Sequence, residues 1–427
     1  MNRKSIASWC LYDFANSIYV AVVPATIWAA YYANVIVGND QGQGDLWWGR
    51  VVSSTMLFVA VTSPVLGAIA DYAGVRKRLL ILYTVAAVSG TCLLATISPG
   101  MALAGFALSL LANIGLEGSM VFYNAYLPEL APPHYRGRVS GWGFGVGYAG
   151  SLLGLLVALP LVGRELYGVT FIVTGVGFAL FALPAFFWLP PDAPARLSVP
   201  QAALGGMRET WRTFREILRT QRELRWFLLA YFLYIDGVNT VIYFSSIFAA
   251  KTLGFPMTRL IVLYAVVQVS ALAGAFLWAK PTDRLGPKKI VLMMLGQWVV
   301  VVTATYFVQT QAQFFVVAVL GGSALGAIQA ASRAFMSTLI PPGREGEFFG
   351  FYALSGKSAS ILGPLVFGTV SAATGGNQRL AILSVLAFLV AGFLLLRKVN
   401  AGRPINAPAA APLTAPFAPE PCVALFA

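Results

Sequence analysis

The chain has 427 residues, of which 58% are hydrophobic and 11% are charged, and its formal net charge is +13. Soluble domains usually carry about 25% charged residues, so this composition excludes an ordinary soluble fold and indicates an integral membrane protein. The basic residues fall in short clusters between apolar runs, which is typical of topology determinants and not of a nucleic-acid-binding face. The three cysteines and the single histidine are too scattered for a metal site or a disulfide framework. We therefore expect no cofactor, no metal and no nucleic-acid partner.

Apolar runs long enough to cross a bilayer recur along the chain. A spanning helix needs about 20 apolar residues, and polar or turn residues divide the sequence into twelve candidate spans. They cover residues 4–37, 46–70, 79–97, 101–127, 138–162, 168–189, 225–250, 258–280, 290–309, 314–340, 347–373 and 380–397. The sequence therefore predicts an all-α membrane protein with twelve transmembrane helices.

A polar segment separates the sixth and seventh candidate spans. The linker LPPDAPARLSVP is followed by apolar residues at helical spacing among arginines, namely Met207, Trp211, Phe214, Leu218 and Leu224. This pattern predicts an amphipathic helix with a basic face, which lies on the cytoplasmic membrane surface or braces the two halves of the protein. Residues 191–224 are thus expected to form a cytoplasmic linker. The tail 401–427 is rich in Ala and Pro and is expected to be disordered.

Most of the 29 lysines and arginines lie in one alternating set of loops, which includes the linker. Short loops rich in Lys and Arg stay on the cytoplasmic side of a membrane. Both termini are therefore expected in the cytoplasm. Arg333 and Lys357 are exceptions, because they fall within predicted spans.

Two internal matches relate the halves of the chain. Asp71 and Gly74, after the second span, recur as Asp283 and Gly286 after the eighth. The stretch LYDFANSIYV in the first span carries Asp13, Asn16 and Ser17, and the seventh span repeats this pattern as Asp236, Asn239 and Thr240. Two halves in the same orientation predict two pseudo-symmetric six-helix bundles, residues 1–190 and 225–400.

The loop motif G-x-x-x-D-x-x-G-x-R-K, from Gly67 to Lys77, resembles the signature of the major facilitator superfamily. The blocks WCLYDFANSIY, YNAYLPEL, QAASRAFMSTLIPPGREGEFFGFY and SGKSASILGPLVFG are similar to the family of autophagy-linked vacuolar amino-acid effluxers and their bacterial relatives. The resemblance implies the major facilitator fold and an amino-acid efflux carrier. We expect a multi-pass protein of the bacterial inner membrane, acting as a monomer on a small-molecule solute and protons.

The repeated loops are expected to form a cytoplasmic gate that opens and closes as the two bundles rock. Asp71 is predicted to lie near the start of the eleventh span, around Glu347, because a helix N-terminus favours a carboxylate. By the same symmetry Asp283 should face Arg138. Tyr72 stands where the superfamily signature usually has Arg, so the latch is expected to depend on residues 76–78. The predicted gating residues are Gly67, Asp71, Gly74, Arg76, Lys77, Asp283, Arg284 and Gly286. The alternative is a charged loop that only sets topology.

The spans contain few ionisable residues, and each needs a reason to be there because a charge in hydrocarbon is costly. Those residues are Asp13, Glu117, Asp236, Arg333 and Lys357. Asp13 and Asp236 share helix faces with their Asn and Ser or Thr neighbours, and the two faces are predicted to line a central cavity. Arg333 lies closer to its helix end and is predicted to snorkel or to pair.

These charges either pair for structure or bind a zwitterion, with its carboxylate on a cation and its ammonium on an acid. Glu117 or Asp236 could also carry a coupled proton, because burial penalises a charged carboxylate. The leading function is secondary transport of small zwitterions such as amino acids. Export of amphipathic or lipid-like compounds is the alternative, and a non-transporting sensor or scaffold is a remote one. The sequence shows no nucleophile paired with a base, so we do not expect an enzyme.

Overall fold

The computed structural model describes residues 2–38, 43–255, 257–359, 362–374 and 377–400, and every regular element within these ranges is a helix. The elements are α1 (Arg3–Val22), α2 (Ile27–Tyr31), the π-helix η1 (Tyr32–Gly38), α3 (Gln43–Tyr72), α4 (Arg76–Leu93), η2 (Leu94–Thr96), α5 (Ala102–Ala125), α6 (Leu127–Leu130), η3 (Pro133–Tyr135), α7 (Arg136–Val162), α8 (Tyr167–Trp188), α9 (Val199–Arg219), α10 (Arg222–Leu253), α11 (Met257–Leu285), α12 (Pro287–Phe307), α13 (Gln311–Leu339), α14 (Glu345–Ser358), α15 (Leu362–Ala373), α16 (Gln378–Ser384) and α17 (Leu386–Arg397).

Within the described residues, eleven helical stretches are long and apolar enough to cross a membrane. The predicted span 347–373 corresponds to α14 and α15, which have 14 and 12 residues and are each shorter than a full span. The predicted first span, 4–37, was too long. The helix α1 ends at Val22 because Pro24 has no backbone N–H to continue it, and α2 and η1 follow.

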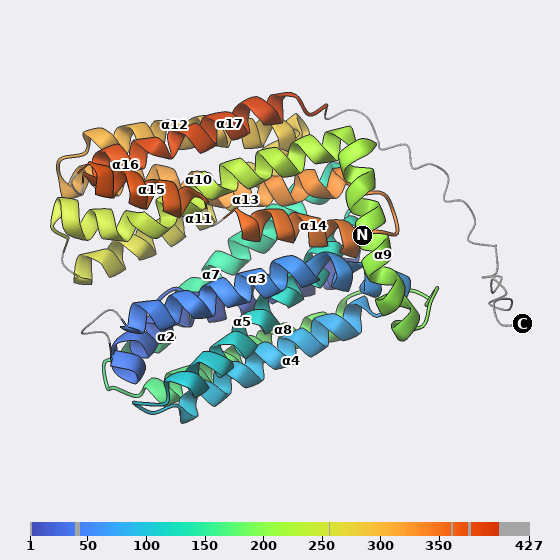
Figure 1. Ribbon diagram of the computed structural model, residues 1–427, viewed down its shortest axis with the longest axis horizontal. Helices are drawn as coiled ribbons and strands as arrows, with labels where there is room; N and C mark the ends of the chain where they lie inside the picture. The colour runs from blue at the N-terminus through green and yellow to red at the C-terminus, as the bar shows by residue number, and fades with distance from the viewer. Residues whose placement is uncertain (1, 39–42, 256, 360–361, 375–376, 401–427) are drawn as a thin grey trace, which may run out of the picture.

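The helices form two bundles (Figure 1), one from α1 to α8 and the other from α10 to α17. Each bundle has its own buried core, built around Trp9, Trp28 and Phe178 in the first and Phe227, Trp298 and Phe335 in the second. The helix α9 runs across the ends of the spans beside the N-terminus (Figure 1). We call this the α9 end of the molecule, and the opposite end, where α2 lies, the α2 end.

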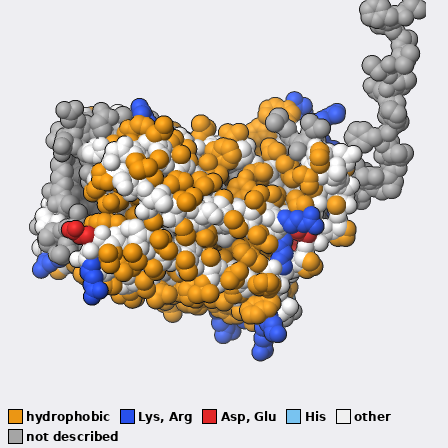
Figure 2. All heavy atoms as spheres, turned by 90° about the horizontal axis from the view of Figure 1, so that it is seen from below, with side chains coloured by type: hydrophobic (Ala, Val, Ile, Leu, Met, Phe, Trp, Pro, Cys, Tyr) orange, Lys and Arg blue, Asp and Glu red, His pale blue; other side chains and the backbone are white. Residues whose placement is uncertain are grey.

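The outside of the bundles is apolar. Large side chains such as Leu57, Phe187 and Leu277 are 68–75% exposed, which suits a hydrocarbon environment and not water. Figure 2 shows hydrophobic side chains over most of one face, with Lys and Arg mainly toward its margins. The all-α, two-bundle architecture predicted from the sequence is therefore confirmed.

The bundles meet toward the α9 end, where α3 packs on α14 and α7 packs on α11. Gly67 makes the first contact possible, because a Cβ on this residue would lie 2.1 Å from the carbonyl oxygen of Gly346. No side chain fits at that distance. Two helices of different bundles thus touch backbone to backbone, and Asp71 lies beside this contact, since a Cβ on Gly346 would lie 2.8 Å from its Oδ1.

Candidate functional site

Asp71 joins the two bundles at the α9 end. Its Oδ2 accepts the backbone N–H of Glu347 at 3.0 Å, and its Oδ1 accepts from Arg76 at 2.8 Å. The carboxylate of one bundle therefore caps the N-terminus of α14 in the other, where the helix dipole and the free N–H groups favour a negative charge. This is the position that the sequence predicted for Asp71.

Arg76 extends this contact into a network. Its guanidinium also pairs with Glu129 and lies 3.3 Å from Glu345 of the second bundle. The predicted latch over residues 76–78 is only partly found, since Lys77 and Arg78 turn to the linker instead. The Lys77 backbone N–H donates to Asp192 at 2.6 Å, and Arg78 lies 3.6 Å from the same carboxylate.

The second copy of the motif repeats the cap. Asp283 accepts from the backbone N–H of Arg138 at 3.2 Å and from its Nε at 2.8 Å, at the start of α7. Gly74 and Gly286 have φ angles of +59° and +87°, which explains why glycine recurs three residues after each aspartate. Arg284 is exposed at the end of α11.

Farther into the bundles, Asp13 of α1 pairs with Arg333 of α13 at 3.1 Å. Arg333 also donates to the Oγ of Ser140 at 2.9 Å and lies against the rings of Trp9 and Phe144, at 4.5 and 4.1 Å. The side chains of Arg333 and Asp13 are only 2% and 5% exposed. Of the two alternatives for Arg333, pairing is found and snorkelling is not, because Asp13 and Ser140 bind its guanidinium in place.

A second ion pair also connects the bundles. Lys357 of α14 lies 2.6 Å from Glu117 of α5, and the two side chains are 30% and 16% exposed. This pair is therefore partly exposed, whereas the pair of Asp13 and Arg333 is buried. Tyr231 packs against Gly356, next to Lys357, and Tyr243 is 53% exposed on the same helix, α10.

The aspartates on the polar faces of α1 and α10 bind different helices, α13 and α15, and the common cavity expected between these faces stays a prediction. Asn16 donates to the carbonyl of Tyr12 and to Asp13, within α1, and Ser17 is half-buried beside them. Asp13 of α1 binds Arg333 of α13, whereas Asp236 of α10 binds the start of α15.

On α10, Asp236 accepts from the backbone N–H of Gly363 in α15 at 2.8 Å. Its other oxygen, Oδ1, is buried and has no hydrogen-bond partner within the described residues. Thr240 donates to the Asp236 carbonyl at 2.7 Å, and Asn239 is half-buried on the adjacent face. Asp236 thus holds the start of α15 with one oxygen and keeps the other free.

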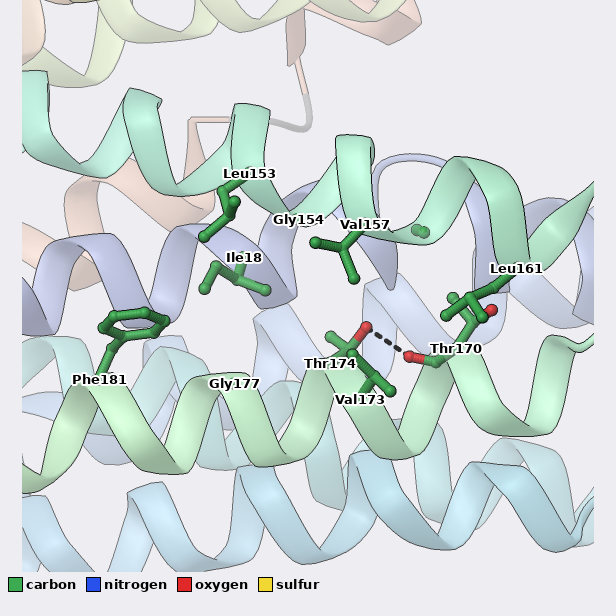
Figure 3. Close-up of a pocket in the computed structure, with 11 residues that line it drawn as sticks. Ile18, Leu153, Gly154, Val157, Leu161, Thr170, Val173, Thr174, Gly177 and Phe181 are labelled. Carbon is green, nitrogen blue, oxygen red and sulfur yellow. Dashed lines mark hydrogen bonds between the residues drawn. The ribbon is translucent and has the colours of Figure 1, made fainter.

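An apolar pocket of about 160 Å³ lies between α1, α7 and α8 (Figure 3). Its walls include the apolar side chains of Ile18, Leu153, Leu161 and Phe181. The hydroxyl of Thr174, which also lines the pocket, donates to the Thr170 carbonyl at 2.7 Å. None of the lining residues within the described part of the chain is charged. The pocket therefore offers nothing to balance the charges of a zwitterion.

Sequence reasoning missed several partners of these charges. Ser140 and Trp9 carry no charge signal, and Glu129 looks like an ordinary loop residue. The repeated Glu in GREGEF was the one signal that marked the start of α14 as acidic. No group of three or more His, Cys, Asp or Glu side chains that could hold a metal ion occurs in the part of the chain that the structure describes.

Comparison with known proteins gives a consistent result. The family model "Vacuole effluxer Atg22 like" matches residues 51–408. The "Uncharacterized MFS-type transporter YxiO" of Bacillus subtilis is 31% identical over 92% of this chain and 94% of its own. "Autophagy-related protein 22" of Coccidioides immitis is 24% identical over 82% of this chain and 72% of its own.

Solved structures agree on the fold. The human organic anion transporter MFSD10 superposes with a TM-score of 0.72 at 17% identity, over 92% of this chain and 98% of that one. The proton:xylose symporter XylE superposes with a TM-score of 0.70 at 14% identity, over 92% and 94%. Together with the two bundles and the paired caps at their junction, these matches show that the chain belongs to the vacuole effluxer Atg22-like family of MFS-type transporters.

Proposed function

We propose that this transporter moves small zwitterionic solutes, with amino acids favoured, and that Glu117 and Lys357 bind them. The observation that carries the proposal is the partial exposure of this ion pair at the junction of the bundles. A zwitterion can replace the pair by placing its carboxylate on Lys357 and its ammonium on Glu117. Both charges then keep a partner, which avoids the cost of an unpaired charge in a low dielectric.

The buried ion pair of Asp13 and Arg333 supports a different role from that of Glu117 and Lys357. Asp13 and Arg333 are almost completely buried, so a solute cannot reach them without separating the bundles. Breaking such a pair leaves an uncompensated buried charge. We assign this pair to the pivot about which the bundles rock, and the more exposed pair to solute recognition.

The closed contacts at the α9 end are proposed to be the cytoplasmic gate of an alternating-access cycle. The excess of Lys and Arg in the loops at this end supports a cytoplasmic orientation. For export, a cytoplasmic solute enters when the caps of Asp71 on α14 and Asp283 on α7 separate. Because each cap is a charge-assisted bond between the bundles, opening has a definite energetic cost.

Proton coupling is proposed to use Asp236 or Glu117. The unpartnered Oδ1 of Asp236 is the supporting observation, since a buried acceptor without a donor is costly and a bound proton removes its charge. Uptake and release of that proton would then change how firmly Asp236 holds the start of α15.

Proteoliposomes loaded with a panel of labelled amino acids, with and without a pH gradient, test the function. We expect transport of at least one amino acid and its loss in Glu117→Gln and Lys357→Gln. The double exchange Glu117→Lys with Lys357→Glu is the matched control, because it keeps an ion pair but reverses the charges offered to the solute. Full transport by the exchanged protein would make the pair structural and overturn the site. Silence across the panel, with extrusion of an amphipathic dye, would favour the alternative substrate class.

A further inference from the structure

The helix α9 has two unlike faces. Thr213 and Ile217 are buried against the bundles. The opposite face is exposed and strongly basic, and consists of Arg208, Trp211, Arg212, Arg215, Leu218 and Arg219. We call this the arginine face. Two large apolar side chains stand among its arginines, since Trp211 is 54% exposed and Leu218 is 43% exposed.

The buried face ties the two bundles together. Glu216 pairs with Arg344 of the second bundle at 3.0 Å, and Arg344 pairs with Glu347 at 2.9 Å. The segment before α9 is bound to the first bundle, because the backbone N–H groups of Arg196 and Leu197 donate to the Tyr72 carbonyl at 2.9 and 3.0 Å. The helix α9 therefore spans the junction that Asp71 and Glu347 close.

Aromatic contacts connect the arginine face to α14. Trp211 stacks on Phe214 with ring centroids 5.6 Å apart, and Phe214 stacks on Phe351 of α14 at 6.3 Å. Arg215 lies over the Trp211 ring at 5.2 Å. A ligand that immobilises Trp211 consequently restrains the helix that carries Lys357.

We propose that the arginine face binds the acidic headgroups of membrane phospholipids and thereby holds α9 against α14. Three observations favour a lipid over an acidic protein segment. The helix crosses the ends of the membrane spans (Figure 1), where headgroups lie. Its exposed Trp and Leu suit insertion at the boundary of headgroup and acyl chain. Its arginines match the charge of anionic lipids, each contributing about fivefold to affinity. The consequence for the gate rests on the proposed transport cycle, but lipid binding itself does not.

Nanodiscs with a fixed mixture of phosphatidylglycerol and phosphatidylcholine provide the test. Either lipid carries brominated chains, which quench tryptophan fluorescence, while the overall composition stays constant. The signal of Trp211 is the difference between the native chain, which has 10 tryptophans, and Trp211→Phe. We expect brominated phosphatidylglycerol to quench this signal several-fold more than brominated phosphatidylcholine, and salt to reduce the difference.

The triple variant Arg208→Gln, Arg212→Gln and Arg215→Gln should abolish the preference. A control triple variant, Arg3→Gln, Lys4→Gln and Lys289→Gln, removes three exposed charges elsewhere at the α9 end and should retain it. Equal quenching by the two brominated lipids would overturn the proposal, as would a preference that survives the α9 variant. If the native chain shows the lipid preference but transports no amino acid, that result would count against the proposed function alone.

Discussion

The carboxylate of Asp71, at the end of α3, accepts the backbone N–H of Glu347, in the first turn of α14, at 3.0 Å. One bundle thus caps a helix of the other, and the strength of this bond depends on the negative charge. A carboxylate at a helix N-terminus contributes typically 0.3–1 kcal/mol, and more in partly buried geometries. The closed state of the α9 end is therefore stabilised by a bond that a single atom change can weaken.

We expect Asp71→Asn to open the α9 end more often. Cys10 lies one turn before Asp13 on α1 and is 7% exposed, so its alkylation reports this opening. In a chain with Cys92→Ser and Cys422→Ser, a water-soluble maleimide should modify Cys10 about fivefold faster after the substitution. Glu165→Gln, at an exposed position remote from this cap, should leave the rate unchanged. An unaltered rate in Asp71→Asn would show that the cap does not hold the gate.

Gly67→Ala should separate α3 from α14. The added Cβ would lie 2.1 Å from the Gly346 carbonyl oxygen, and backbone must move to accommodate it. We expect a loss of about 1–3 kcal/mol in stability and a lower Tm in thermal unfolding. Gly296→Ala is the matched control, because nothing lies within 4 Å of its added Cβ and alanine favours a helix. Equal Tm changes in the two variants would contradict the close approach.

Local patterns in the sequence were sufficient for the fold class and for the positions of Asp71 and Asp283 at helix starts. Runs of apolar residues determine where helices cross the membrane, and the repeated Asp-x-x-Gly indicated which loops face helix N-termini. Asp71 could be placed near Glu347 because a carboxylate and a helix start attract each other wherever the chain brings them together. The end of α1 at Val22 was missed because Pro24 was read as part of an apolar run.

The pairing of charges inside the spans could not be predicted. Asp13, Glu117, Arg333 and Lys357 are two acids and two cations within the spans, so two pairings satisfy the same charge pattern. The packing of α7 decides between them. Ser140 binds Arg333, and a Cβ on Gly143 would lie 2.7 Å from the Asp13 carboxylate. Neutral residues of this kind leave no charge pattern in the sequence.

The two ion pairs should respond differently to loss of one partner. Asp13→Asn leaves Arg333 charged and sealed, and breaking a buried pair costs about 3–5 kcal/mol. Lys357→Gln leaves Glu117 in contact with solvent, so its cost should be clearly smaller while transport is lost. Thermal unfolding of both variants provides the comparison. The double variant Asp13→Asn with Arg333→Gln should recover part of the stability, and failure to recover any would exclude pairing as the cause.

Acidification should release α9 from the second bundle. Burial opposes the charge of Glu216, but hydrogen bonds from Gln221 and Arg344 and the charge of Arg344 lower the pKa of its carboxyl below the usual 4.5. A carboxyl whose pKa is lowered by folding stabilises the bound state above its ordinary pKa, and this contribution is lost as the pH falls through the lowered value. Hydrogen exchange of α9 amides, corrected for intrinsic rates, should therefore show an acceleration as the pH falls below 4.5. In Glu216→Gln this acceleration should be present at neutral pH and the step below pH 4.5 should be missing, whereas Glu165→Gln should behave as the native chain. A native-like pH step in Glu216→Gln would assign the titration to another group.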